Sequence, residues 1–199
     1  MTLRDMKYSA LAMLVLLPAA VQAQVVGPIP TAMQIRLAVQ AAPPALQADA
    51  TVQGYNEAGA FVTLRAGSND LVCMAPNPNS EQFEVSCHHK DLEGYFARGR
   101  ELIAQGITGN ARTQARWDEI TAGTLSVPMG RTNHIMTGSG FNRETAEILE
   151  PYTRFVLYAP GATGASLGLG ESPTAPAVPW VMFPGTPGAH IMVSPPRGG

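Results

Sequence analysis

Two short runs of strand-forming residues, at positions 71–74 and 83–87, show the most regular pattern in the chain. In the second run apolar and polar residues alternate, which is typical of a strand with one face in the core. The connection between them is rich in proline and asparagine, which favour turns and are rare in central strands. The pattern therefore predicts a β-hairpin at this point of the sequence.

Similar runs upstream, at residues 51–55 and 60–65, predict a second hairpin. Their connection ends in Gly59, which suits a tight turn. The turn-forming residues 67–70 then lead into the first-mentioned hairpin. Because each strand would follow its predecessor through a short turn, we expect residues 51–88 to form a four-strand antiparallel meander.

The clearest helical periodicity covers residues 91–105, where Asp91 would cap the first turn and Gly106 would end the last. Arg98 and Arg100 lie off the apolar face, and we expect their charges to be solvated. The apolar residues that share one face at helical spacing are Leu92, Tyr95, Phe96, Leu102 and Ile103.

Two further helices are predicted from the same kind of spacing. One covers residues 112–121, with Trp117 and Ile120 facing inward. The other covers residues 32–41, with Thr31 as its N-cap, and the prolines at 43 and 44 end it. Residues 24–30 read as a mobile lead into that helix.

The last third of the chain alternates strand-like runs with glycine- and proline-rich segments, and residues 144–149 suggest one or two helical turns. Strands, then helices, then strands point to an α+β domain. We expect an antiparallel sheet with two or three helices packed on one face and Gly/Pro-rich loops towards the C-terminus. The remaining strand candidates are residues 134–137, 154–158, 180–183 and 190–193.

Residues 1–23 have the pattern of a secretory signal peptide. Arg4 and Lys7 form its positive region, residues 10–17 its apolar region, and Ala23 is the small residue before the expected cleavage point. The apolar run is shorter than the roughly 20 residues of a membrane-spanning helix. We therefore expect export to the periplasm or the extracellular space, no integral membrane segment after cleavage, and one globular domain over residues 24–199 with flexible ends.

Composition narrows the classes of partner. The chain has 13 basic and 15 acidic residues, and loss of the signal peptide leaves a mildly acidic domain without a basic stripe. Such a surface argues against nucleic acid as a partner. No phosphate-loop or dinucleotide-binding glycine pattern is present, so no nucleotide cofactor is expected.

Cys73 and Cys87 are the only cysteines. Two cysteines in an exported protein predict one structural disulfide, here closing a loop of about 15 residues in the hairpin. The alternative is a reactive thiol at Cys87 next to His88 and His89, but the oxidising compartment and the second cysteine favour the disulfide.

The sequence resembles a set of exported bacterial proteins of unknown function. The resemblance rests on Gly67-Ser68-Asn69 before Cys73, on the second cysteine ahead of a helix, and on two C-terminal motifs. These motifs are Tyr158-Ala159-Pro160 and Pro184-Gly185-Thr186-Pro187-x-Ala189-x-Ile191-x-Val193. No activity is attached to that group, so the resemblance implies export and carries no catalytic residue onto this chain.

One motif raises the hypothesis of a serine hydrolase. Residues 164–168 match Gly-x-Ser-x-Gly with Ser166 as the nucleophile, and Glu171 and His190 follow in a permitted order. The glycine- and proline-rich surroundings argue against it, since the motif requires a strand before the serine and a helix after it.

Two matching triplets, His134-Ile135-Met136 and His190-Ile191-Met192, raise the hypothesis of a metal site. On a strand, residues i and i+2 share a face, so each triplet would offer an imidazole and a thioether together. These donors suit copper, and the thioethers favour Cu(I). The alternative is that the methionines fill the core and the histidines are ordinary strand residues.

Three functions therefore remain open from the sequence. The first is a non-catalytic binding or envelope-associated protein. The second is a periplasmic copper-binding protein that uses His134, Met136, His190 and Met192. The third is a hydrolase that uses Ser166.

Overall fold

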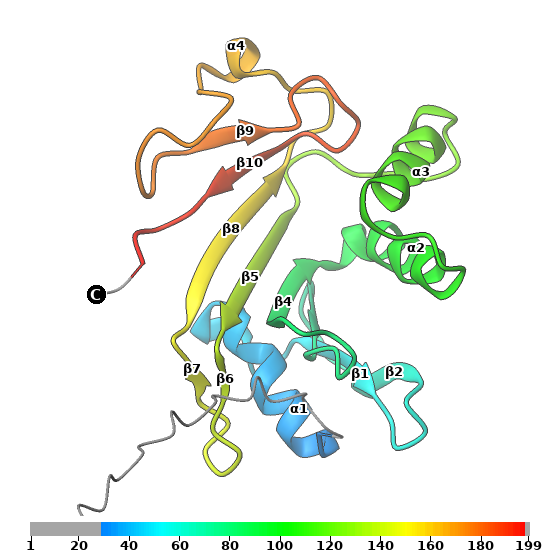
Figure 1. Ribbon diagram of the computed structural model, residues 1–199, viewed down its shortest axis with the longest axis vertical. Helices are drawn as coiled ribbons and strands as arrows, with labels where there is room; N and C mark the ends of the chain where they lie inside the picture. Colours follow the sequence, from blue (N-terminus) through cyan, green and yellow to red (C-terminus); the bar gives the residue numbers. More distant parts are fainter. Residues whose placement is uncertain (1–28, 198–199) are drawn as a thin grey trace, which may run out of the picture.

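An eight-stranded mixed sheet forms the centre of the structure, a computed structural model that describes residues 29–197 (Figure 1). The predicted signal peptide and its cleavage point lie outside these residues. Ile29 is buried, and its carbonyl accepts a hydrogen bond from Gln34 Nε2 at 2.8 Å, so the predicted mobile lead does not reach Pro30. No helix within residues 29–197 has the length and apolar character needed to cross a membrane.

The long helices and the strands of the main sheet fall close to the predicted positions. Helices α1, α2, α3 and α4 span Thr31–Ala38, Glu93–Ala104, Gly109–Thr121 and Gly164–Leu167, and the short 3-10 helices η1, η2 and η3 span Val39–Ala41, Pro44–Leu46 and Lys90–Leu92. Strands β1 to β5 span Thr51–Tyr55, Phe61–Arg65, Leu71–Met74, Phe83–His89 and Thr132–Gly138; strands β6 to β10 span Gly140–Phe141, Ile148–Leu149, Tyr152–Tyr158, Trp180–Met182 and His190–Val193.

The α+β class is confirmed, but the N-terminal meander is wrong. The strand order is β2-β1-β3-β4-β5-β8-β10-β9, so β3 pairs with β1 instead of β2. The β1–β3 pair is parallel, whereas the other neighbours in this sheet are antiparallel. The sheet is therefore mixed and larger than the predicted four-strand unit.

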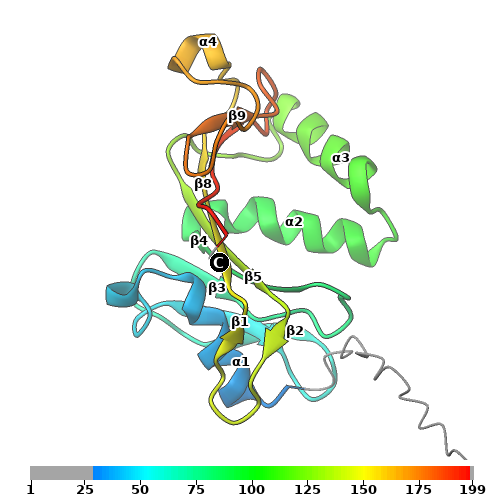
Figure 2. The ribbon, with the colours of Figure 1, turned by 60° about the vertical axis from the view of Figure 1, so that its left-hand side comes forward.

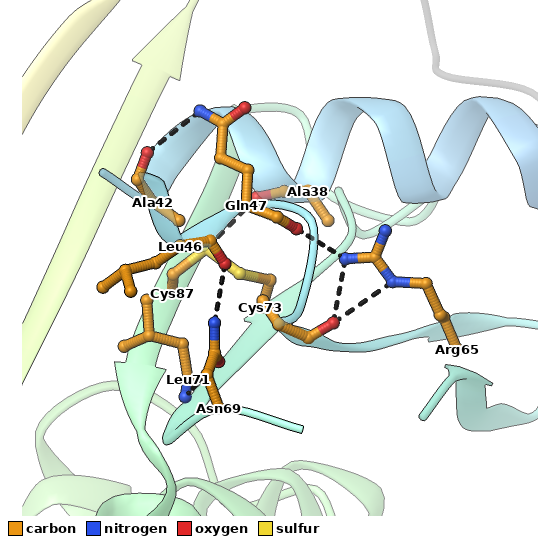
Figure 3. The surroundings of a disulfide bond; sticks show 10 residues. Ala38, Ala42, Leu46, Gln47, Arg65, Asn69, Leu71, Cys73 and Cys87 are labelled. Atoms are coloured by element: carbon orange, nitrogen blue, oxygen red, sulfur yellow. Dashed lines mark hydrogen bonds between the residues drawn. A yellow bond between two sulfur atoms is a disulfide. The ribbon is translucent and has the colours of Figure 1, made fainter. Parts of the chain in front are cut away.

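The segment between β2 and β3 crosses over the start of β1, and this crossing changes the strand order. Ser68 N donates to Asp49 O at 2.8 Å, and Asn69 Nδ2 donates to Leu46 O at 2.7 Å. From β2, Arg65 donates to Gln47 O at 2.7 Å, so the chain before β1 is bonded to both ends of the crossing (Figure 3). A Cβ on Gly67 would lie 2.2 Å from Thr51 N, so only glycine fits there.

We expect Gly67→Ala to lower the free energy of unfolding by about 2 kcal/mol, because its methyl group would meet backbone atoms that cannot move without shifting β1. Urea denaturation followed by circular dichroism measures the change. Gly94→Ala is the matched control, since Gly94 is exposed in α2 with no atom within 4 Å of its Cβ position, and it should not lower stability. Equal effects of the two substitutions would contradict this account of the crossing.

The helices pack on both faces of the sheet, so the expectation that they share one face is wrong. Alternation along β4 sends Phe83, Val85 and Cys87 into a core cluster with α1, while Ser86 and His88 face the other way. A second cluster joins η3 and α2 to β8 and β10. Figures 1 and 2 show α2 and α3 together on one side of β5 and β8, with α1 beside the N-terminal strands.

The predicted helical turns at residues 144–149 are also wrong. This segment forms the turn and second strand of a small ribbon, β6–β7. Asn142 Oδ1 accepts from the backbone of Glu144 at 2.8 Å, and Ala146 and Glu150 have φ values of 59° and 49°. Helical backbone requires negative φ, so the local conformation excludes a helix here.

The Cys73–Cys87 disulfide is confirmed. The two residues face each other on β3 and β4, and both side chains are fully buried. Figure 3 places the bond beneath Ala38 and Ala42, where the chain leaves α1. The disulfide therefore belongs to the core on the α1 side and contributes nothing to the opposite face.

Candidate functional site

A cavity of about 370 Å³ lies between the α2–α3 pair and the sheet face formed by β4, β5, β8 and β10. The sheet contributes Ser86, Asn133, Tyr158 and His190. These residues share a face because His190 pairs with Tyr158, and Asn133 pairs with His88 two residues beyond Ser86. Four strands from separate parts of the sequence thus form one polar wall.

The helices form the opposite wall. Phe96 and Arg100 are four residues apart on α2, and Arg112 and Arg116 are four residues apart on α3, so each pair lies on one helix face. Gly99 lets the helices approach, because a Cβ there would lie 3.1 Å from Arg116 Nη1. The inward face of α3 therefore carries two arginines.

Arg116 is unusual because its guanidinium is buried without an acidic partner among residues 29–197. Its side chain belongs to a residue only 9% exposed, and its Cζ lies 4.0 Å from the ring centroid of Tyr95. Its one hydrogen bond to a described residue is a long contact of 3.5 Å from Nη1 to Tyr95 O. Burial, and the nearby charge of Arg112, lower the pKa of Arg116, but a guanidinium remains charged in proteins.

His190 presents a neutral imidazole to the cavity. Its Nδ1 lies 2.8 Å from Gly188 O, so this nitrogen carries the proton and donates, and Nε2 is left as an acceptor. Burial lowers the pKa of His190, and the hydrogen bond to Gly188 only partly opposes this. Tyr158, whose ring lies 5.5 Å from that of His190, has its pKa raised by burial and stays protonated.

Glu93 lies behind the cavity wall and bonds to Arg100, which lines the cavity. It accepts hydrogen bonds from His88 Nε2 at 2.8 Å, from Gln53 Nε2 at 3.1 Å, and from Arg100 Nη2. Burial alone would raise the pKa of Glu93, but the bonds and charges from His88 and Arg100 lower it to about 2. This bond holds the Arg100 side chain against Glu93 on the same helix. Arg100 is therefore not the solvated charge that the sequence predicted.

Several polar atoms in the cavity walls have no partner. Asn133 Oδ1, Trp117 Nε1 and the Nε atoms of Arg112 and Arg116 are all buried and unbonded within the described residues. Asn133 is only 4% exposed. Buried polar atoms in native proteins are almost always hydrogen-bonded, and four of the eight exceptions among the described residues belong to residues that line this cavity.

The four predicted copper ligands do not come together. His134 and Met136 pair with Cys87 and Val85 and lie on the α1 face of the sheet, whereas His190 and Met192 lie on the α2–α3 face. The reason is register: His134 opposes Phe155 on β8, three residues from Tyr158, which opposes His190. Across the part of the chain that the structure describes, no group of three or more His, Cys, Asp or Glu residues is placed to hold a metal ion.

Ser166 lies in α4, where it has a structural role. Its backbone N–H donates to Thr163 Oγ1 at 3.1 Å, and its Oγ accepts from Thr163 N at 3.0 Å, which is a capping box. Glu171 accepts a hydrogen bond from Gly164 N at 2.8 Å and does not contact a histidine. The serine is exposed and has no base, so the arrangement does not form a nucleophile site.

Sequence reasoning found His190 but missed Asn133, Tyr158, Arg112 and Arg116. The sequence does hold one signal for the two arginines, which is their spacing. The side of the predicted helix 112–121 that carries Trp117 also carries both arginines. Charged residues on an apolar helix face are rarely buried without a purpose. Nothing local marked Asn133 or Tyr158, because their positions depend on strand pairing.

Comparison with known proteins adds no relatives. No protein-family model matches the chain, and neither a curated protein nor a solved structure shows significant similarity to it.

Proposed function

We propose that this chain is an exported binding protein that holds a small molecule in the cavity between the sheet and the α2–α3 pair. The observation that carries the proposal is the set of buried, unpartnered polar atoms around that cavity. Unpaired buried groups are destabilising, and small rotations of these side chains towards a bound molecule would supply their partners. A volume of about 370 Å³ suits one small organic ligand.

Export and a bacterial envelope location belong to the same proposal. The signal-peptide pattern of residues 1–23 and the resemblance to exported bacterial proteins support it. The Cys73–Cys87 disulfide is consistent with an oxidising compartment.

The arrangement of titratable groups favours binding over catalysis. Acid–base and nucleophilic catalysis need a reactive group within hydrogen-bond reach of its partner. His190 is hydrogen-bonded to the carbonyl of Gly188, and the nearest ring neighbours are Tyr158 and Phe183. Its role is therefore to accept a hydrogen bond from a ligand and to shape the cavity.

Native mass spectrometry of the exported protein, incubated with metabolites below 1 kDa from its own cells, tests the proposal. We expect an adduct of one small molecule per chain. Ser86→Phe should abolish the adduct, because Ser86 is buried on the cavity floor and the larger ring would fill the space.

Thr153→Phe is the matched control, since Thr153 is exposed on β8 and opposes Met136 on the other sheet face. It should retain the adduct. A wild-type protein that takes up no small molecule, or a Ser86→Phe variant that is folded and keeps the same adduct, would rule out this cavity as the binding site.

A further inference from the structure

We propose that the ligand is a small organic anion whose carboxylate or phosphate group binds between Arg112 and Arg116. This inference rests on the proposed function of the cavity and adds the chemical class of what it holds. It follows from the charges around the cavity, from the polar atoms that lack partners, and from the shape of the apolar wall.

The charges leave two arginines without acidic partners. Within residues 29–197, ion pairs join Arg98 to Glu119, Arg100 to Glu93 and Arg154 to Glu84, but none includes Arg112 or Arg116. A buried charge that is not paired costs several kcal/mol relative to water. Arg116 is such a charge, and half-buried Arg112 lies one helical turn from it; the pair is best explained by an anion that enters the cavity.

Among residues 29–197, no free carboxylate in the cavity can serve as that anion. Glu84 also lines the cavity, but its Oε2 lies 3.4 Å from Arg154 Nη2 on β8. Glu93 accepts bonds from His88, Gln53 and Arg100. None of the described carboxylates is therefore available to balance the charge of the two arginines.

The geometry of α3 suits an oxyanion. Arg112 and Arg116 are one helical turn apart, and Nε is unpartnered on each. Guanidinium groups offer parallel N–H donors that match the two oxygens of a carboxylate or phosphate. Stacking of Arg116 on Tyr95 fixes the plane of its guanidinium, which reduces the ordering needed on binding.

The other residues that line the cavity indicate the chemistry of the rest of the ligand. Phe96, Trp117 and Phe183 provide aromatic walls that suit a flat, apolar group. Asn133 Oδ1 and His190 Nε2 can each accept a hydrogen bond, so we expect the far end of the ligand to carry a hydroxyl or amine donor. A single ring with an acidic group at one end and a donor at the other meets all of these conditions.

Calorimetric titration of the mature protein with four probes tests the inference. The probes are 4-hydroxybenzoate, its neutral amide 4-hydroxybenzamide, phenyl phosphate and inorganic phosphate. We expect the benzoate or phenyl phosphate to bind, and the amide to bind at least tenfold more weakly. The relative affinities of the benzoate, phenyl phosphate and inorganic phosphate separate a carboxylate ligand from a phosphate ester or a free phosphate.

Variants link the binding to the two arginines. Arg116→Gln and Arg112→Gln should each weaken the binding of the anionic probe at least tenfold, whereas Arg143→Gln, which removes the same charge from an exposed side chain near β6, should not change it. Arg112 is half-buried, so its variant keeps the test valid even where Arg116→Gln fails to fold.

Equal binding of the benzoate and the amide, or unchanged affinity in both folded arginine variants, overturns the anion inference. Binding of none of the four probes overturns it as well. In each case the adduct seen by native mass spectrometry and its loss in Ser86→Phe still decide whether the cavity binds a small molecule, so failure of the anion inference is distinguishable from failure of the proposed function.

Discussion

Replacing both cysteines, in Cys73→Ala/Cys87→Ala, should lower the free energy of unfolding by about 3 kcal/mol. The bond joins residues 14 positions apart, and closing a loop of about this length removes conformational entropy from the unfolded chain worth about 3 kcal/mol. Both side chains are fully buried against α1 and η1, so the substitution also removes packing in that core. Alanine is preferred to serine because it buries no hydroxyl group.

Urea denaturation with and without a reducing agent measures the effect. The wild-type protein should fall to the stability of the double variant when the bond is reduced, and the variant should not respond to the reducing agent. A wild-type protein of unchanged stability after complete reduction would show that the bond is not a source of stability.

Glu93→Gln should lower the free energy of unfolding at pH 7 by about 3 kcal/mol. The folded protein lowers the pKa of Glu93 from 4.5 to about 2, and each unit corresponds to about 1.4 kcal/mol of differential stability. The carboxylate on α2 bonds to His88 on β4 and to Arg100 on α2, and a neutral amide would leave their donors with a weaker acceptor.

The same group predicts a pH dependence. Because the folded pKa of Glu93 lies below its unfolded value, its contribution is fully present above about pH 4.5 and is lost as the pH falls towards about 2. We expect wild-type stability to fall more steeply than that of Glu93→Gln in this window. The two curves, measured by urea denaturation at intervals from pH 7 to pH 2, should therefore converge at the acidic end.

Glu57→Gln provides the control for the loss of one negative charge. Glu57 is exposed in the β1–β2 turn and makes no ion pair to any described residue. Its curve should follow that of the wild type throughout. Parallel curves for the wild type and Glu93→Gln would mean that the ionised carboxylate of Glu93 does not stabilise the folded protein through its bonds to His88 and Arg100.

The correct sequence predictions share a local physical cause. The strand pattern of 83–87 and the spacing in 91–105 depend on residues close in sequence, and both elements formed within a few residues of the expected bounds. The Cys73–Cys87 bond was predictable for the same reason, since the two residues face each other across one hairpin. Thr31 was wrong as an N-cap only by one position, because Pro30 takes that place.

The errors arise where the outcome depends on distant residues. The meander failed because residues 66–70 cross the start of β1, and only contacts of Gly67 and Asn69 with residues 46–51 show this. The four-ligand copper site failed because one three-residue difference in register sends His134 and His190 to opposite faces. The strand register cannot be predicted from the residues of either triplet alone.

The sequence by itself determined the α+β class, the positions of the main-sheet strands and the long helices, and the disulfide, because periodicity and short loops encode them. Only the tertiary structure decided the order of the strands, the split of the helices between two faces, and the cavity where Asn133, His190 and Arg116 meet. These residues lie on β5, β10 and α3, so their meeting depends on how four strands and two helices pack together. The pairing and packing of distant segments depend on the whole fold, so they cannot be predicted from a local sequence pattern.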